Sequence, residues 1–231
     1  MKSDSVVDAL ILQMGFAQSP EAERAAVAEL AQSRPDLSAL LANALKSRNG
    51  HDAAMVCRAL GMLGPAAREA LPALQSVAGR RSMLVLKSHE ADVAERAIVA
   101  IRADDPEFIS EALASGRSDT RMGAVDAIAS GAVALSDEQA ASAAELLGEM
   151  VGGGDGRAGA VALEALVALG TRAEGALPEI VSRATIPDPQ GRLSEVMRVR
   201  FTGALRTLGR AGLTVGPALA ELLVDRNELV R

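Results

Sequence analysis

The sequence predicts an all-α protein, an α-solenoid (superhelix) of about six antiparallel helix pairs with an extra N-terminal helix. Composition is the first reason. The 231 residues include no Trp, no Tyr and only three Phe, yet 49% are hydrophobic. Ala, Leu, Val, Ile and Met must therefore fill the core, and Ala-rich segments favour closely packed helices over a β-sandwich. The second reason is an internal repeat, which is typical of stacked helical units.

The repeat begins with Ala-Leu and ends with Leu-Gly, at residues 59–64, 165–170 and 204–209. A proline follows each final glycine by eight positions, and an aliphatic residue follows each proline by two. These prolines are Pro72, Pro178 and Pro217. Glycine is common just after a helix, and proline fits the first turn of the next one. Each copy therefore predicts a helix, a break and a second helix.

The N-terminal half of the chain predicts five helices in order. Apolar residues at helical spacing indicate a helix over 3–15. Ser19 can cap the next helix, with Pro20 at its first position. Pro35 and Asp36 begin a third helix, which Asn49-Gly50 ends. Apolar residues at helical spacing over 51–63 predict a fourth helix, and Pro72 begins a fifth helix. The apolar stretch 83–86 in the following connector is expected to pack.

The remaining helices are predicted from caps and breaks. Ser88 can cap a helix that extends to Ile101, and Asp105-Pro106 begins its short partner. Arg117 begins the next first helix, which ends near residue 130. Ser136 and Gln139 have the spacing of a capping box. The further predicted helices cover 137–151, 155–169, 178–184, 193–208 and 217 to the C-terminus.

This organisation is read as a single repeat domain over residues 1–231. Residues 1–16 form the N-terminal capping helix. The approximate repeats are 17–49, 50–87, 88–116, 117–152, 153–188 and 189–231.

The pattern Ala-Leu-Gly-x-Leu-Gly-Pro-x-Ala-x-x-Ala-Leu-Pro-Ala-Leu, complete at 59–74, resembles bacterial HEAT repeats of the PBS-lyase type. The resemblance implies two antiparallel helices per repeat, stacked right-handed, with second helices lining a concave face. Family members are mostly scaffolds and adaptors. The motif residues are structural, so no functional residue carries over. Leucine precedes Pro72 and Pro178, whereas Gly216 precedes Pro217.

Charge and hydropathy argue against a nucleic-acid-binding protein and against a membrane protein. The net charge of −6 argues against a nucleic-acid binder, which usually carries a basic stripe. The sequence contains no run of about 18 apolar residues, so it predicts no membrane span. The N-terminal segment has Asp4 and Asp8 and does not resemble a signal peptide or a basic membrane anchor. We expect a cytoplasmic protein.

The residues that usually carry chemistry are sparse. His51 and His89 are the only histidines, and neither has a second ligand at metal spacing. Cys57 falls on an apolar helical face and is expected in the core. The glycines at 152–154 lack the Lys-Ser/Thr of a phosphate loop. We therefore expect no enzyme, no metal and no cofactor.

Acidic residues on the predicted second helices give a candidate partner-binding surface: Glu138, Glu145, Glu149, Glu179, Glu221 and Asp225. Such a surface would attract a protein partner with a basic patch. The alternative is that these acids only solubilise the groove. The arginines at 80–81 and along 192–210, with Lys87, are read mainly as solvated charges.

The expected function is a non-enzymatic scaffold or adaptor that binds protein through its concave face or loop ridge. Two alternatives remain: a HEAT-like nucleic-acid-binding or repair protein, and a bilin lyase-like protein. Open-ended solenoids also associate end to end, so self-association stays open.

Overall fold

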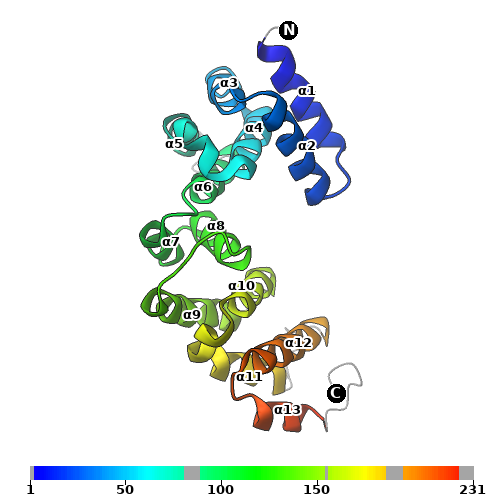
Figure 1. Ribbon diagram of the computed structural model, residues 1–231, viewed down its shortest axis with the longest axis vertical. Coiled ribbons are helices and arrows are strands. Elements are labelled where there is room, and N and C mark those ends of the chain that lie inside the picture. Colours follow the sequence, from blue (N-terminus) through cyan, green and yellow to red (C-terminus); the bar gives the residue numbers. More distant parts are fainter. Residues whose placement is uncertain (1–2, 81–88, 154–155, 186–194, 224–231) are drawn as a thin grey trace. The chain divides into compact units, whose positions relative to one another are not determined.

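The computed structural model describes residues 3–80, 89–153, 156–185 and 195–223, and within these ranges every regular element is a helix. The predicted all-α class is confirmed. The chain divides into two units, Met1–Ala124 and Val125–Arg231, and each is described by itself (Figure 1).

The first unit contains an N-terminal helix followed by helix pairs. Its elements are α1 (Ser3–Phe16), α2 (Pro20–Ser33), α3 (Leu37–Ala44), α4 (Gly50–Leu63), the 3-10 helix η1 (Gly64–Ala70), α5 (Leu71–Ala78), α6 (His89–Ile101) and α7 (Pro106–Leu113). Helix α8 (Ser118–Ala129) crosses the boundary between the units.

The second unit is also built of helix pairs. Its elements are α9 (Asp137–Gly152), α10 (Gly156–Leu169), the 3-10 helix η2 (Gly170–Ala176), α11 (Leu177–Thr185), α12 (Glu195–Ala211) and α13 (Gly216–Leu222). The predicted stretch 83–86 and the loop at 186–189 lie outside the described residues.

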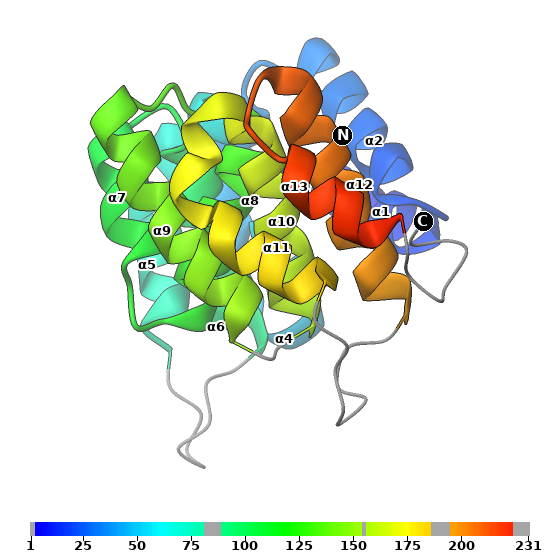
Figure 2. The same cartoon turned by 90° about the horizontal axis from the view of Figure 1, so that it is seen from below.

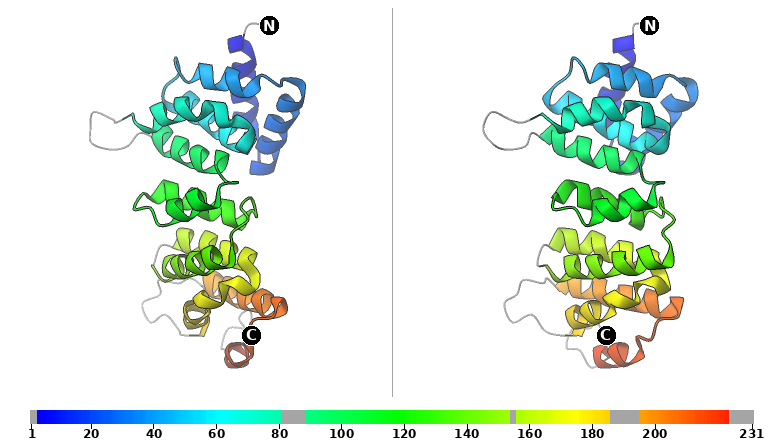
Figure 3. Two further views of the ribbon diagram at one scale, coloured as in Figure 1. Left: turned by 60° about the vertical axis from the view of Figure 1, so that its left-hand side comes forward. Right: turned by 90° about the vertical axis from the view of Figure 1, so that its left-hand side faces the viewer.

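Inside each unit, helices pack on their counterparts in the neighbouring pair. In the first unit α2 contacts α4, α4 contacts α6, and α3 contacts η1 and α5. In the second unit α10 contacts α12, α9 contacts η2 and α11, and α11 contacts α13. Figures 2 and 3 show these layers within each unit. A helix pair therefore buries its apolar face against its neighbours, as stacked repeats do.

Three predicted caps are present, and the fourth, Ser88, lies outside the described residues. Ser19 Oγ accepts a hydrogen bond from the backbone N–H of Ala22 at 3.2 Å, and Asp105 Oδ1 accepts one from Phe108 at 3.1 Å. Ser136 Oγ accepts from the Gln139 N–H at 3.2 Å, and Gln139 Oε1 accepts from the Ser136 N–H at 3.0 Å. This reciprocal pair is the capping box that fixes where α9 begins.

Two of the three sequence repeats have matching backbones. Gly64 and Gly170 have φ of 57° and 61°, a region that favours glycine. Each begins a 3-10 helix that the sequence did not predict. Pro72 and Pro178 are then the second residues of α5 and α11.

The third repeat departs from this pattern. Helix α12 continues past Gly209 to Ala211, and the positive φ, 113°, falls on Gly212. The predicted end near residue 208 was therefore three residues early. A Cβ atom on Gly209 would lie 2.5 Å from Val215 Cγ2. Here glycine makes room for a neighbouring side chain, and it does not end the helix.

The end of α3 also differs from the prediction. The helix ends at Ala44, and Gly50 begins α4 with φ of 59°. The guanidinium of Arg80 donates hydrogen bonds to the carbonyls of Leu45 and Arg48, both at 3.0 Å. These bonds hold the turn between α3 and α4, which occupies the residues before Gly50.

Candidate functional site

Helix α9 carries three of the acids singled out from the sequence. It buries one face, made of Ala140, Ala143, Ala144, Leu147, Gly148 and Val151. Glu138, Glu145 and Glu149 are exposed. Their spacings of seven and four residues bring them to one side of a helix with 3.6 residues per turn. We call these three residues the α9 acidic row.

The neighbouring repeat leaves the row uncovered. A Cβ atom on Gly175 of η2 would lie 3.6 Å from Glu145 Cγ, and one on Gly148 would lie 3.3 Å from Ala176 Cβ. Helix α9 and η2 therefore pack closely through small residues. Because Gly175 has no side chain, nothing from that position shields the Glu145 carboxylate.

The α9 acidic row has no ion-pair partner in the described part of the chain. Glu145 and Glu149 are four residues apart, a like-charge spacing that costs about 0.2–0.5 kcal/mol on a helix. Glu149 also lies in the last turn of α9, which has no basic residue. A negative charge is unfavourable at that end of the helix dipole. These two charges therefore do not stabilise the fold.

Glu179 has a different environment from the row. Its Oε1 accepts a hydrogen bond from Arg183 Nε at 2.8 Å. The same arginine donates through Nη2 to the backbone carbonyl of Gly152 at the end of α9. Glu179 thus orients an arginine that ties α11 to α9. The side chain of Glu221 and all of Asp225 lie outside the described residues.

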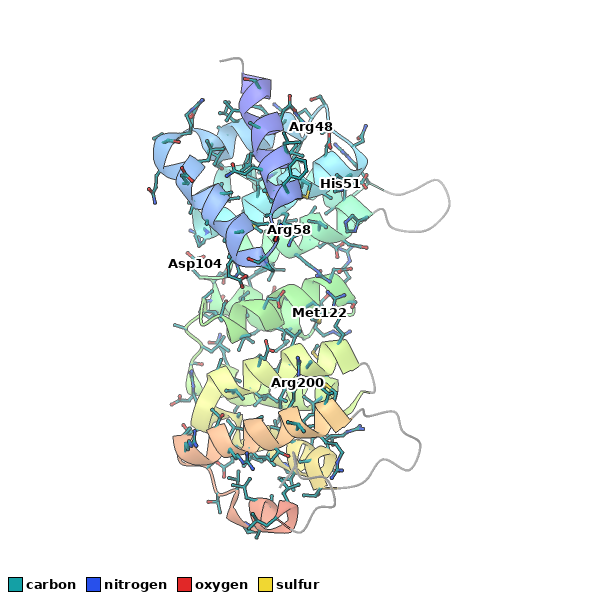
Figure 4. The ribbon with its side chains drawn as sticks, turned by 90° about the vertical axis from the view of Figure 1, so that its right-hand side faces the viewer. Arg48, His51, Arg58, Asp104, Met122 and Arg200 are labelled. Atoms are coloured by element: carbon teal, nitrogen blue, oxygen red, sulfur yellow. The ribbon has the colours of Figure 1, made fainter. Side chains whose placement is uncertain are left out.

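Other acids of the chain are also held by arginines. Within the first unit, Glu23 on α2 is 8% exposed and meets Arg58 of α4 at 2.7 Å. Glu95 on α6 is 4% exposed, with Arg117 at 3.0 Å and Thr120 at 3.2 Å. Figure 4 labels Arg58, and also Arg48, whose guanidinium pairs with Asp8 of α1. In contrast to these paired acids, the α9 acidic row has no arginine partner among the described residues.

The arginines weighed as binding residues divide into two groups. Arg80 and Arg198 donate to backbone carbonyls, Arg198 to that of Ala184 at 3.3 Å. Arg200 and Arg210 are exposed on α12, and Figure 4 labels Arg200. Arg81, Lys87 and Arg192 lie outside the described residues. The ion pair of Arg183 with Glu179 had a sequence signal, their spacing of four residues. The bond of Arg183 to the Gly152 carbonyl had none, because it depends on how α11 packs on α9.

The residues weighed for chemistry differ in their exposure. His51 and His89 are exposed near the starts of α4 and α6. No cluster of His, Cys, Asp and Glu suited to a metal ion occurs within the ranges described above. Cys57 is fully buried, and burial raises the pKa of its thiol to about 12. A thiol with that pKa is a poor nucleophile near neutral pH.

Each unit has an open groove within its described residues. The groove between α3 and α5 has a volume of about 430 Å³ and includes Lys46, Glu69 and Arg80. The Arg80 guanidinium there is held by backbone carbonyls. The groove between α12 and α13 has a volume of about 340 Å³ and is mostly apolar. Among the helices described, none is long and apolar enough to cross a membrane.

No family model matches the sequence, and no curated protein matches it. Among solved structures, the chain is similar to a crystal structure of an engineered protein, at 18% identity and a TM-score of 0.46. The match covers 100% of this chain and 66% of that structure. Similarity at this level carries no argument about fold or function.

Proposed function

We propose that this protein is a non-enzymatic scaffold or adaptor of the HEAT-like type, which binds a protein partner through the α9 acidic row. The proposal rests on one observation. Glu145 and Glu149 are exposed, unpaired within the described residues, and placed where their charge lowers stability. Charges that cost stability are typical of functional surfaces.

The geometry of the row suggests the chemistry of the partner. At a rise of 1.5 Å per residue, Glu138 and Glu145 are about 10.5 Å apart along α9, and Glu145 and Glu149 about 6 Å. Lys or Arg side chains on one face of a partner helix match these intervals, because the same spacings recur on any α-helix. Phosphate groups would be repelled, so the row favours a basic protein over a nucleic acid.

Affinity would come from several modest contacts along the row and from electrostatic steering. The proposal includes a cytoplasmic location, which the sequence suggested and which a fractionation experiment can check. It requires no metal, cofactor or covalent step.

Affinity capture tests this function directly. The full chain carrying Glu145→Lys and Glu149→Lys is compared with the wild type and with Glu164→Lys, using lysate of the source organism and mass spectrometry. Glu164 is exposed on α10 in the same unit, so its reversal matches the charge change away from the row. A basic protein captured by the wild type and Glu164→Lys, but lost with the double variant, supports the proposal. An identical set of captured proteins for all three chains contradicts it.

A further inference from the structure

Asn49 and Gly50 form an exposed pair of residues where α4 begins. Figure 4 labels Arg48 and His51, which flank the pair in the sequence. In an Asn-Gly step, the backbone nitrogen of glycine can attack the side-chain amide of asparagine, because glycine has no Cβ atom to hinder the approach. The sequence contains no other Asn-Gly step, so this chemistry is specific to one position.

The backbone around the pair leaves room for this attack. Gly50 has φ of 59°, and nothing lies within 4 Å of a Cβ atom built on it. The first N–H groups of a helix have no partner inside the helix, and the Asn49 side chain makes no capping hydrogen bond to them. Rotation about the Cα–C bond of Asn49, where ψ is 166°, brings the Gly50 nitrogen toward Asn49 Cγ. This rotation loosens only the first turn of α4, where helices fray most easily.

The guanidinium of Arg80 polarises the amide that is attacked. Its Nη1 donates a hydrogen bond to Asn49 Oδ1 at 3.1 Å. The carbonyls of Leu45 and Arg48 hold the same guanidinium in place. Attack on Asn49 Cγ places negative charge on Oδ1, and a fixed, positively charged donor stabilises such charge. Arg80 is therefore positioned like the donor of an oxyanion hole.

We propose that Asn49 is a self-modification site, at which the Gly50 nitrogen displaces the side-chain amide with the help of Arg80. The Gly50 nitrogen loses its proton to water and bonds to Asn49 Cγ. The Cγ–Nδ2 bond breaks, and ammonia leaves after taking a proton from water. One water molecule then opens the cyclic imide at either carbonyl carbon, which gives aspartate or isoaspartate. The net reaction consumes one water and releases one ammonia, without oxidation or reduction.

The aspartate product has a stronger bond to Arg80 than asparagine has. A neutral amide oxygen becomes a carboxylate, and a hydrogen bond between two ions is shorter and stronger than one to a neutral acceptor. The new negative charge also lies at the N-terminus of α4, where the helix dipole favours it. Modification therefore tightens the turn between α3 and α4 and makes the protein more negative by one charge. This inference does not depend on the α9 acidic row.

Ageing of the purified full chain in mildly alkaline buffer tests the proposal, because the Gly50 nitrogen must lose its proton to react. Ion-exchange chromatography follows the more negative species, Asn49→Asp supplies the reference for the aspartate product, and peptide mass spectrometry locates the converted residue. Conversion is expected at Asn49. Asn43 is the internal control, because Ala44 follows it within α3. A synthetic peptide with the sequence of residues 45–53 sets the time scale. A folded chain whose Asn49 stays intact after the peptide has converted, or whose Asn43 converts as fast, overturns the proposal.

Two matched arginine variants test the role of Arg80. Arg80→Met removes the donor to Asn49 Oδ1. Arg68→Met makes the same charge change in the same unit, at an exposed arginine that pairs with Asp104. Circular dichroism and urea unfolding check that both variants are folded. Conversion of Asn49 is expected to be at least about tenfold slower in Arg80→Met than in wild type, and unchanged in Arg68→Met. Equal rates in the two variants, or faster conversion in Arg80→Met, would overturn the role of the guanidinium.

Discussion

The backbone of Gly123 on α8 lies directly against the Val99 side chain of α6. A Cβ atom added to Gly123 would be 2.9 Å from Val99 Cβ, closer than two carbon atoms pack. Gly61 of α4 has a similar relation to α6, with an added Cβ 3.2 Å from Ala97 Cα. Small residues therefore set how closely successive helices of the first unit approach.

Replacing Gly123 with alanine should destabilise the protein although alanine is the better helix former. The new methyl group would overlap Val99, and overpacking typically costs about 1–3 kcal/mol. Gly203→Ala is the matched control, because nothing lies within 4 Å of that added Cβ on α12. There the substitution should stabilise by up to about 1 kcal/mol. Urea unfolding measures both; shifts of the same sign would contradict the packing argument.

Arg183→Ala should weaken the second unit. The change removes the bond to the Gly152 carbonyl and leaves Glu179 without its partner. The pair is partly exposed, so the expected loss is about 0.5–1.5 kcal/mol. Arg200→Ala is the control, since Arg200 is exposed on α12 and should change stability by less than about 0.5 kcal/mol. Equal effects of the two changes would mean that the bonds of Arg183 with Gly152 and Glu179 contribute nothing to stability.

Asp105 should make stability depend on acid pH. A hydrogen bond from Arg102, and then one from the Phe108 N–H, hold the pKa of the Asp105 carboxyl below its ordinary value. The carboxylate therefore stabilises the fold above its unfolded-state pKa, and this contribution is lost as pH falls through the lower folded-state pKa. Asp105→Asn keeps a capping side chain and removes the charge. Its deficit against wild type should be present near pH 7 and should disappear as pH falls below the folded-state pKa of Asp105. A deficit independent of pH would exclude this role.

Cys57 should be unreactive in the folded protein. Its side chain is fully buried, and its thiol has a pKa of about 12 because of that burial. A thiol reagent should modify Cys57 only as the chain unfolds, with labelling that follows the urea transition seen by circular dichroism. Rapid stoichiometric labelling of the native protein would show that the first unit opens at this site.

The helices were predictable because their signals are local. Ser19, Asp105 and the Ser136–Gln139 pair begin helices where their side chains can cap them, and Pro72 and Pro178 occupy first turns. The 3-10 helices at Gly64 and Gly170, and the extension of α12 beyond Gly209, were missed. The extension of α12 depends on the close approach of Val215 to Gly209, which helical spacing does not show. The 3-10 helices begin at the positive φ of Gly64 and Gly170.

The candidate site was predictable in part. Helical spacing alone gathers Glu138, Glu145 and Glu149 on one helix, so the sequence could group them. Glu179 has the same chemistry, and helical spacing alone places it beside Arg183 on α11. The bond from Arg183 to the Gly152 carbonyl, however, requires a fold that brings α11 beside α9. The same holds for Gly175, whose missing side chain matters only because Glu145 lies next to it.

The binding claim is tested most directly by the affinity of a captured partner for the wild type and for Glu149→Lys. Placing a positive charge in the last turn of α9 should raise the unfolding free energy by about 0.3–1 kcal/mol. It should also weaken binding at least about tenfold, with a shallower salt dependence. Calorimetric titration together with urea unfolding measures both quantities. Unchanged affinity in a stabilised Glu149→Lys variant would contradict the account.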